Sequence, residues 1–146
     1  MTTSTKRAEA PTSTTITLPA ISIELQPGET FCGPLLDERG QVECYPIWMS
    51  GDDKGKYFDD ALAAAQARGG DLPSPREAWL ALAAGVKFPR SWIWLNKREG
   101  SSNAWYCYSD GYQGYDDRSA PGGAVAVRRV FPHGVDSPPE RKLIGA

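Results

Sequence analysis

The residue types that could carry nucleophilic or metal chemistry are few in this chain and lie far apart. Its three cysteines, Cys32, Cys44 and Cys107, have no Cys-x-x-Cys spacing, and its single histidine is His133. Zinc sites use closely spaced cysteine and histidine ligands. The sequence therefore predicts no zinc site, and we expect neither a metal ion nor another cofactor.

The cysteines have more than one interpretation. A disulfide between Cys32 and Cys44 is compatible with their spacing, whereas reduced, partly buried thiols are the usual state in a cytosolic protein. Cys107 lies in the run Trp105-Tyr106-Cys107-Tyr108, where no acid or base is suggested as a partner for its thiol. We therefore predict that Cys107 is a core residue and not a nucleophile.

Aspartates occur in pairs at Asp52-Asp53, Asp59-Asp60 and Asp116-Asp117, and Asp110-Gly111 adds a further carboxylate. Such residues suggest a site for a hard cation, but none of them has the spacing of an EF-hand loop. Nothing in the sequence places two carboxylates across a cleft, as glycoside hydrolysis requires. Solvated turns and helix starts account for these charges, so we predict that the protein is not an enzyme.

Composition limits the classes of partner. The chain has 146 residues, of which 40% are hydrophobic, enough to build one core. Its 16 Lys and Arg against 18 Asp and Glu give a net charge of −2, which disfavours generic binding to nucleic acid. No apolar run approaches the ~20 residues that span a bilayer, and residues 1–15 lack the apolar stretch of a signal peptide. We expect no membrane insertion and a cytoplasmic location, unless the protein leaves the cell within a particle.

Three regions follow from the pattern of apolar residues. Residues 1–15 are rich in Thr and Ser and predict a disordered or extended arm. Residues 16–131 predict a single domain, and the Pro-rich residues 132–146 predict a loose tail. At the start of the domain, an alternating pattern broken at Pro19 predicts an edge strand with Ile16, Leu18, Ile21, Ile23 and Leu25 as its apolar positions.

A hairpin and two helices are predicted next. Residues 31–36 and 42–49 flank the polar turn Asp37-Glu38-Arg39-Gly40, a pattern typical of a β-hairpin. Residues 57–68 place apolar side chains on one helical face and stop at Gly69-Gly70. The run Ser74-Pro75-Arg76-Glu77 combines a capping box with a proline at the first helical position, so we expect a second helix to begin there.

The remaining segments predict strands. Residues 92–95, 104–108 and 112–115 are short and aromatic, and the polar segments between them favour a three-stranded meander. Residues 124–130 predict a final strand, which we expect to pair with the first strands. The predicted fold is therefore α+β, with two helices, a twisted antiparallel sheet and an irregular, glycine-rich loop region that contains Gly111, Gly114, Gly122 and Gly123.

Several motifs occur in an order that resembles a known family. They are the run Gly69 to Glu77, which contains Leu-Pro-Ser-x-x-Glu, then Trp92-Ile93-Trp94, then Ala104 to Gln113 with its Asp-Gly turn, and finally Ala126-Val127-Arg128-Arg129. This order resembles small bacterial and phage proteins of the C-type-lectin-like superfamily, whose hallmarks are a Leu-Pro-Thr-x-x-Glu helix start and a closing Val-Arg strand. The resemblance covers residues 31–131 and implies a C-type-lectin-like fold and a phage or prophage source.

Departures from the family pattern narrow what the resemblance implies. Asp71 stands where the family commonly has Arg, and Trp92-Ile93-Trp94-Leu95 replaces a Trp-Ser-Ser run. The tripeptides with which the sugar-binding lectins hold calcium are absent from the sequence, so calcium-dependent sugar binding is not expected. Members that form formylglycine have a catalytic cysteine pair, and Cys107 has no such companion.

Tyrosines near the predicted loops are the best candidates for binding. If Trp92, Trp94 and Trp105 fill the interior, Tyr108, Tyr112 and Tyr115 lie near the loops at residues 109–120, where a tyrosine offers a large contact area with a polar tip. The alternative is that these rings merely cover the sheet. We predict a partner-binding surface formed by Tyr108, Tyr112, Tyr115 and Arg118.

These observations favour non-enzymatic binding to a macromolecule, most simply a protein. We expect an intracellular accessory protein, encoded by a phage or prophage, that binds a host or phage protein, for example to inhibit a defence component. The alternative is a virion module of the tail or capsid that takes part in binding a receptor or glycan on the host surface. The first would be found in the host cytoplasm and the second in the virion.

Overall fold

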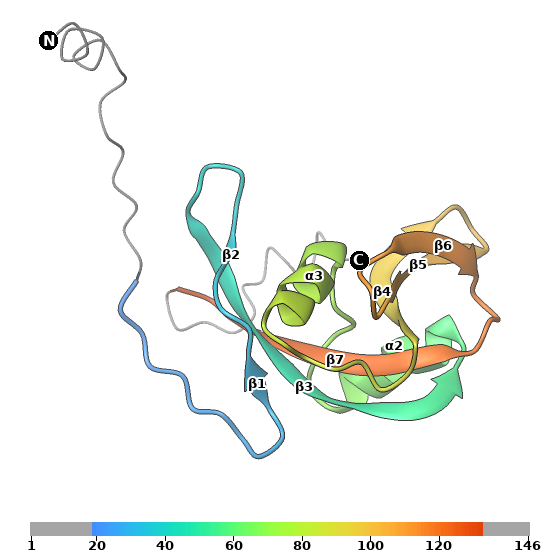
Figure 1. The fold of residues 1–146 in the computed structure, drawn as a ribbon, viewed down its shortest axis with the longest axis horizontal. Helices are drawn as coiled ribbons and strands as arrows, with labels where there is room; N and C mark the ends of the chain where they lie inside the picture. The colour runs from blue at the N-terminus through green and yellow to red at the C-terminus, as the bar shows by residue number, and fades with distance from the viewer. Residues whose placement is uncertain (1–18, 133–146) are drawn as a thin grey trace, which may run out of the picture.

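The computed structural model describes residues 19–132, which form an α+β fold with two helices and a mostly antiparallel, open sheet (Figure 1). The predicted arm at 1–15, the start of the predicted edge strand and all but the first residue of the predicted tail lie outside the described residues. The helices are α2 (Phe58–Ala67) and α3 (Pro75–Ala83). The strands are β1 (Thr30–Phe31), β2 (Leu35–Leu36), β3 (Val42–Lys56), β4 (Trp92–Glu99), β5 (Asn103–Tyr108), β6 (Gln113–Asp117) and β7 (Gly122–Val130).

The strand order along the sheet is β1-β3-β7-β4-β5-β6, with β2 also paired to β3. The long β3 and β7 pair antiparallel, which confirms the predicted pairing of an early strand with the last strand. The pair was expected near one end of the fold and lies instead inside the strand order. β4 joins β7 in parallel through the pair Ile93 and Gly123. The β4-β5-β6 meander, also predicted, extends the sheet from there.

Strand β7 lies between the two helices, and both of its faces are buried (Figure 1). Val125 and Val127 pack in one core cluster with Ala78 and Ala81 of α3. Ala124 and Ala126 pack in a second cluster with side chains of α2, because successive strand residues point to opposite faces. The two faces of the sheet are called the α3 side and the α2 side below.

The start of α3 is the feature that local sequence determines most directly. The Ser74 hydroxyl accepts a hydrogen bond from the Glu77 amide at 3.2 Å, and the Glu77 carboxylate accepts one from the Ser74 amide at 2.7 Å. Pro75 occupies the first turn, where its missing N–H costs nothing. The predicted capping box is therefore confirmed, and it fixes the position of Glu77.

The predicted hairpin is confirmed around the turn at Asp37, where β2 pairs with β3. Its first strand, predicted over residues 31–36, is divided into β1 and β2, and residues 32–34 belong to neither. The Asp37 carboxylate accepts hydrogen bonds from the amides of Arg39 and Gln41 at 2.9 and 3.0 Å, which closes the turn. β3 continues beyond the predicted end, through register irregularities, to Lys56.

The predicted edge strand at the start of the domain is wrong for the residues that the structure describes. Residues 19–26 form no strand, although Ile21 and Ile23 pack against a cluster of Tyr45, Ile47 and Val130. Alternate burial can arise from such packing without a hydrogen-bonded ladder. Leu25, the next position of the pattern, is exposed.

The glycines expected in an irregular loop region instead lie mostly in strands. Gly114 belongs to β6, and Gly122 and Gly123 begin β7. A Cβ atom at Gly122 would lie 2.3 Å from the Trp92 ring, so the glycine is needed for this close approach. The glycine is present because an aromatic ring packs directly on the strand backbone. A single sequence does not distinguish a glycine of this kind from a glycine in a loop.

The three cysteines, Cys32, Cys44 and Cys107, are free thiols and buried. Cys107 belongs to the core cluster of the α3 side, as predicted. Burial raises the pKa of the Cys107 thiol, so at neutral pH it is a poor nucleophile.

Candidate functional site

Three tyrosines meet on the α2 side of the meander. Tyr106 and Tyr108 lie on β5, and Tyr112 directly precedes β6. The ring centroid of Tyr106 lies 5.2 Å from that of Tyr108 and 6.5 Å from that of Tyr112, and the last two centroids are 5.9 Å apart. We call Tyr106, Tyr108 and Tyr112 the tyrosine cluster.

The tyrosine cluster has a buried base and an open surface. The Tyr106 ring packs against Trp92, at 5.4 Å between centroids, and is half-buried. Tyr108 and Tyr112 remain 38% and 60% exposed. Burial, with smaller contributions from neighbouring groups, raises the pKa of Tyr106, so this phenol stays protonated at neutral pH. The cluster thus offers aromatic surface with polar tips and no general base.

The turn that presents Tyr112 is held at both ends. The Asp110 carboxylate accepts a hydrogen bond from the Tyr112 amide at 3.0 Å. Gly111 has a φ of 97°, a conformation that favours glycine, and its carbonyl accepts a hydrogen bond from the Trp79 indole of α3 at 2.7 Å. The exposed rings therefore stand on a turn that is tied to a helix.

Tyr115 lies on the opposite face of the meander from the tyrosine cluster. On the α3 side its ring packs near that of Trp105, with centroids 5.5 Å apart, because these two residues are directly paired across β5 and β6. Tyr115 is 52% exposed, and Trp79 of α3 is 51% exposed. The meander thus carries exposed aromatic rings on both faces.

Arg118, the fourth predicted site residue, is held by the rest of the fold. Its guanidinium forms an ion pair with Asp59 at the start of α2, donates a hydrogen bond to the Ser101 carbonyl at 3.2 Å, and lies 5.3 Å from the Phe58 ring. The structure therefore brings Tyr108 and Tyr112 together and places Tyr115 and Arg118 elsewhere. The partner-binding role of all four residues stays a prediction.

The expected burial of the tryptophans is met by Trp94 alone. Its side chain is fully buried, and its indole donates a hydrogen bond to the Lys56 carbonyl at 2.8 Å. Trp92 and Trp105 are half-buried and lie on opposite faces of the sheet, where they support the tyrosine cluster and Tyr115 respectively.

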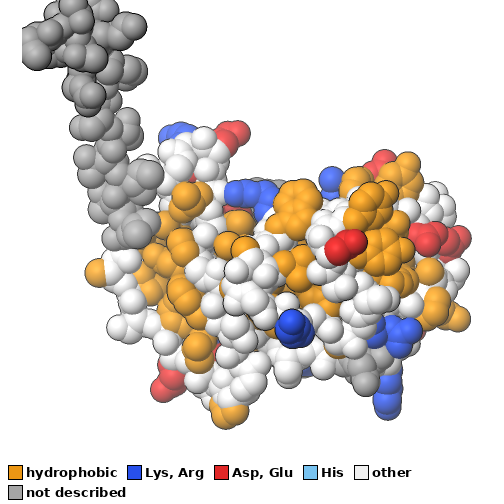
Figure 2. All heavy atoms as spheres, in the orientation of Figure 1, with side chains coloured by type: hydrophobic (Ala, Val, Ile, Leu, Met, Phe, Trp, Pro, Cys, Tyr) orange, Lys and Arg blue, Asp and Glu red, His pale blue; other side chains and the backbone are white. Residues whose placement is uncertain are grey.

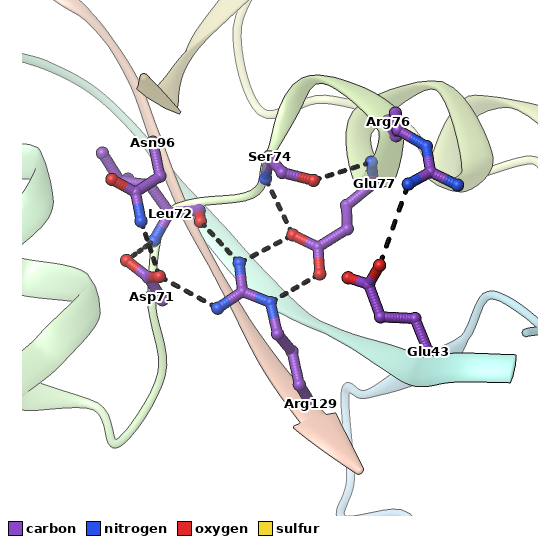
Figure 3. A network of polar contacts seen from close by, with 8 residues as sticks. All are labelled: Glu43, Asp71, Leu72, Ser74, Arg76, Glu77, Asn96 and Arg129. Atoms are coloured by element: carbon purple, nitrogen blue, oxygen red, sulfur yellow. Dashed lines mark hydrogen bonds and ion pairs between the residues drawn. The ribbon is translucent and has the colours of Figure 1, made fainter. Parts of the chain in front are cut away.

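A second polar constellation lies where the N-terminus of α3 meets β7 (Figure 3). Arg129 donates two hydrogen bonds to the Glu77 carboxylate, at 2.5 and 2.7 Å, and one to Asp71 at 2.9 Å. It also donates one to the Leu72 carbonyl at 3.2 Å, and Asn96 donates one to Asp71 at 2.7 Å. We call these residues, with Ser74, the Arg129 network.

The Arg129 network is saturated by its own members. Burial alone would raise the pKa of the Glu77 carboxyl, but the hydrogen bonds and charge of Arg129 outweigh it, so that pKa lies below its usual range. Both Glu77 oxygens and both Asp71 oxygens accept hydrogen bonds from the chain. Such an arrangement joins a helix to a strand. Each carboxylate oxygen is already bound within the chain, so none is free to exchange a proton with a substrate.

The capping box predicts a local role for Glu77, and the motifs of the sequence do not predict its ion pair with Arg129. A usable signal was the adjacent pair Arg128-Arg129 in an otherwise apolar strand. Neighbouring strand residues point to opposite faces, so at least one of these arginines faces a covered side of the sheet. A buried guanidinium requires a carboxylate partner there. The structure supplies Glu77 for Arg129 and Glu29, at 2.9 Å, for Arg128.

The surface around the meander is where apolar and acidic groups meet. Figure 2 shows hydrophobic side chains gathered over the end of the molecule formed by β4, β5 and β6, with acidic side chains among them and basic ones beside them. Within residues 19–132, no group of three or more His, Cys, Asp or Glu side chains is arranged to hold a metal ion. No helix of the described part of the chain is long and apolar enough to cross a membrane.

Comparisons with known proteins leave the site to be interpreted from its own geometry. A scan against protein-family models gives no match, and a search of curated proteins gives no similar sequence.

Proposed function

We propose that this protein is a non-enzymatic module that binds another protein through the tyrosine cluster. One observation carries the proposal: Tyr108 and Tyr112 keep much of their ring surface exposed on a turn that the fold holds in place. Tyrosine contributes large contact area at low conformational cost and is enriched among the residues that dominate binding energy. A fixed turn also reduces the entropy that binding would otherwise cost.

The proposal includes a fold family and a biological setting. We assign the α+β fold to the C-type-lectin-like superfamily, because the motifs of the sequence occur in the family order and because an early strand and the last strand pair beside two helices. From that resemblance we infer a phage or prophage source and an intracellular accessory protein that binds a host or phage protein, for example a defence component.

The alternative, a virion module that binds the host surface, is favoured by one geometric detail. The centroids of the exposed Tyr108 and Tyr112 rings lie 5.9 Å apart with their planes inclined by 33°, and a sugar ring can stack on exposed aromatic rings of this kind. The two settings differ in where the protein is found. Detection of the chain in purified particles would support the virion module, and detection only in lysates of infected cells would support the accessory protein.

The test of protein binding is substitution of one exposed ring. Tyr112→Ala should weaken binding to the captured partner by about tenfold or more, which is about 1.4 kcal/mol. Tyr57, at the N-cap of α2, is 53% exposed and outside the tyrosine cluster, so Tyr57→Ala is the matched control and should bind normally. Affinity would be measured by titration calorimetry on variants whose melting temperatures match that of the original chain.

Equal affinity of the Tyr112→Ala, Tyr108→Ala and original chains would overturn the proposal. Loss of folding in both tyrosine variants, with normal binding per folded molecule, would also overturn it, because the rings would then serve the sheet alone.

A further inference from the structure

We propose that the open edge of β6 accepts an extended, basic segment of the partner protein as an added strand. This inference rests on the proposed protein-binding function and names the chemistry of the partner. β6 ends the strand order of the sheet and lies on the outside of the meander (Figure 1). A terminal strand offers unpaired backbone groups to another chain, which is the basis of recognition by strand addition.

The hydrogen bonds around β6 show which of its backbone groups face outward. The Tyr108 amide donates to the Tyr112 carbonyl at 2.8 Å, and the Arg118 amide donates to the Ser102 carbonyl at 3.0 Å. Antiparallel pairing alternates, so the even-numbered residues between these two bonds direct their N–H and C=O groups toward β5. The N–H and C=O groups of Gln113 and Tyr115 therefore point away from the sheet. Among the described residues, no strand pairs with β6 on that side, and none of the turn and loop hydrogen bonds uses these four groups.

Exposed aromatic rings flank this edge on both faces. Tyr112 and Tyr108 lie on the α2 side, and Tyr115 and Trp79 lie on the α3 side. An added strand points its side chains alternately to the two faces. The incoming segment would thus find an exposed aromatic ring on each face of the sheet, whereas its backbone would pair with Gln113 and Tyr115.

Charge selects the occupant of the edge. Asp110, Asp116 and Asp117 are exposed along β6 and its preceding turn, and no Lys or Arg within residues 19–132 forms an ion pair with them. Two copies of β6 placed side by side would bring these carboxylates together, and such like charges oppose pairing. Lysine or arginine side chains would be attracted by the carboxylates and would also favour the tyrosine faces. A basic segment of a partner protein therefore fits the edge of β6, whereas the β6 strand of a second copy of this chain does not.

The probe for this inference is a short synthetic peptide of alternating Lys and Val residues, added to the full chain at low salt. It should slow hydrogen exchange at the Gln113 and Tyr115 amides in NMR spectra. The corresponding Glu and Val peptide should bind at least tenfold more weakly. A Lys and Val peptide methylated on alternate backbone nitrogens keeps its charge and loses donors for pairing, so it should also bind at least tenfold more weakly when the methylated nitrogens face β6.

Matched variants of the chain test the role of charge. Asp116→Asn combined with Asp117→Asn keeps oxygen acceptors for the amides of Asp117 and Ser119, and should weaken binding of the Lys and Val peptide at least tenfold. Glu24→Gln combined with Glu38→Gln removes the same number of exposed charges away from β6 and should leave binding unchanged.

Three results would overturn the inference. Equal binding of the methylated and unmethylated peptides would show charge attraction without strand addition. Equal binding of the acidic and basic peptides would remove charge as the selecting feature. Dimerisation of the chain, with protection of the same two amides in the absence of peptide, would assign the edge to a second copy.

The two proposals fail separately. If a captured partner requires Tyr112 but is insensitive to the change at Asp116 and Asp117, the tyrosine cluster binds protein and the edge does not. If the peptide adds to β6 while Tyr112→Ala leaves partner affinity unchanged, the edge inference stands and the proposed function fails.

Discussion

The Arg129 network and the tyrosine cluster are built on one sheet, and they differ in what completes their contacts. Arg129, Glu77 and Asp71 form hydrogen bonds with one another and with neighbouring backbone, and Glu77 is only 2% exposed. Tyr108 and Tyr112 rest on other rings but leave much of their surface open. A group whose contacts lie within the chain contributes to folding, whereas open aromatic surface gains its contacts from another molecule. The four predictions below test that distinction, beginning with the largest effect.

Removal of the acid at the centre of the Arg129 network should be the most damaging change. Glu77→Ala leaves the Arg129 guanidinium largely buried without its principal partner, and we expect a loss of about 3–5 kcal/mol in the free energy of unfolding. Urea denaturation would measure it. The control is Glu38→Ala, which removes an exposed carboxylate from the turn that follows β2, and the loss should stay below about 1 kcal/mol. Similar losses in both variants would contradict the distinction.

Acid should weaken the Arg129 network before it affects the aromatic surface. The pKa of Glu77 in the folded chain is lowered from its ordinary value of 4.5, so the unfolded chain takes up the proton first as the pH falls. The contribution to stability is therefore complete above about pH 5 and decreases as the pH drops through 4.5 toward the folded pKa. Unfolding free energies measured across this range should fall less steeply in Glu77→Gln. An equally steep fall in that variant would assign the acid sensitivity to other carboxyls.

Arg118 combines features of both regions. It was predicted to bind a partner, like the tyrosine cluster, but its contacts lie within the chain, like those of the Arg129 network. Arg118→Ala removes the ion pair with Asp59 and the contact with the Phe58 ring, and we expect a loss of about 1–2 kcal/mol in stability. Thermal denaturation would measure the effect, with Arg39→Ala, at an exposed arginine of the turn that follows β2, as the control. Unchanged stability together with weaker partner binding would return Arg118 to the binding surface.

Loss of the helix cap should have the smallest effect of the four. Ser74→Ala removes the acceptor for the Glu77 amide but leaves the ion pair with Arg129, so we expect a loss of about 1 kcal/mol. Ser74→Asp retains an acceptor and should recover most of this stability. A melting temperature that does not change in Ser74→Ala would mean that the network, and not the cap, positions the start of α3.

Local chemistry explains which parts of the fold could be predicted from the sequence. Ser74 and Glu77 lie three residues apart and satisfy one another, so the start of α3 needed no knowledge of the tertiary structure. The turn at Asp37 likewise closes with its own neighbours. The failed edge strand shows the limit: Ile21 and Ile23 are positioned by contact with Tyr45 and Val130, which are distant in sequence.

The sequence predicted which residue types form the candidate site, but it did not predict on which face of the sheet each of them lies. Proximity in sequence suggested that Tyr112 and Tyr115 share a surface, but three steps along an extended segment reverse the face of the side chain. Arg118 forms an ion pair with Asp59, and no residue near Arg118 in the sequence predicts that partner. The pairing of Arg129 with Glu77 joins two motifs that were each recognised separately.

The pairing of β3 with β7 has a consequence for the kinetics of folding. It joins Tyr45 to Val130, so most of the described chain lies in a loop that must close before this ladder forms. Closure of such a loop is entropically costly, and folds dominated by distant pairings fold slowly. The β4-β5-β6 meander closes over short turns and does not wait for that event. The rings of the tyrosine cluster can therefore assemble early, whereas Arg129 reaches Glu77 only when the last strand docks.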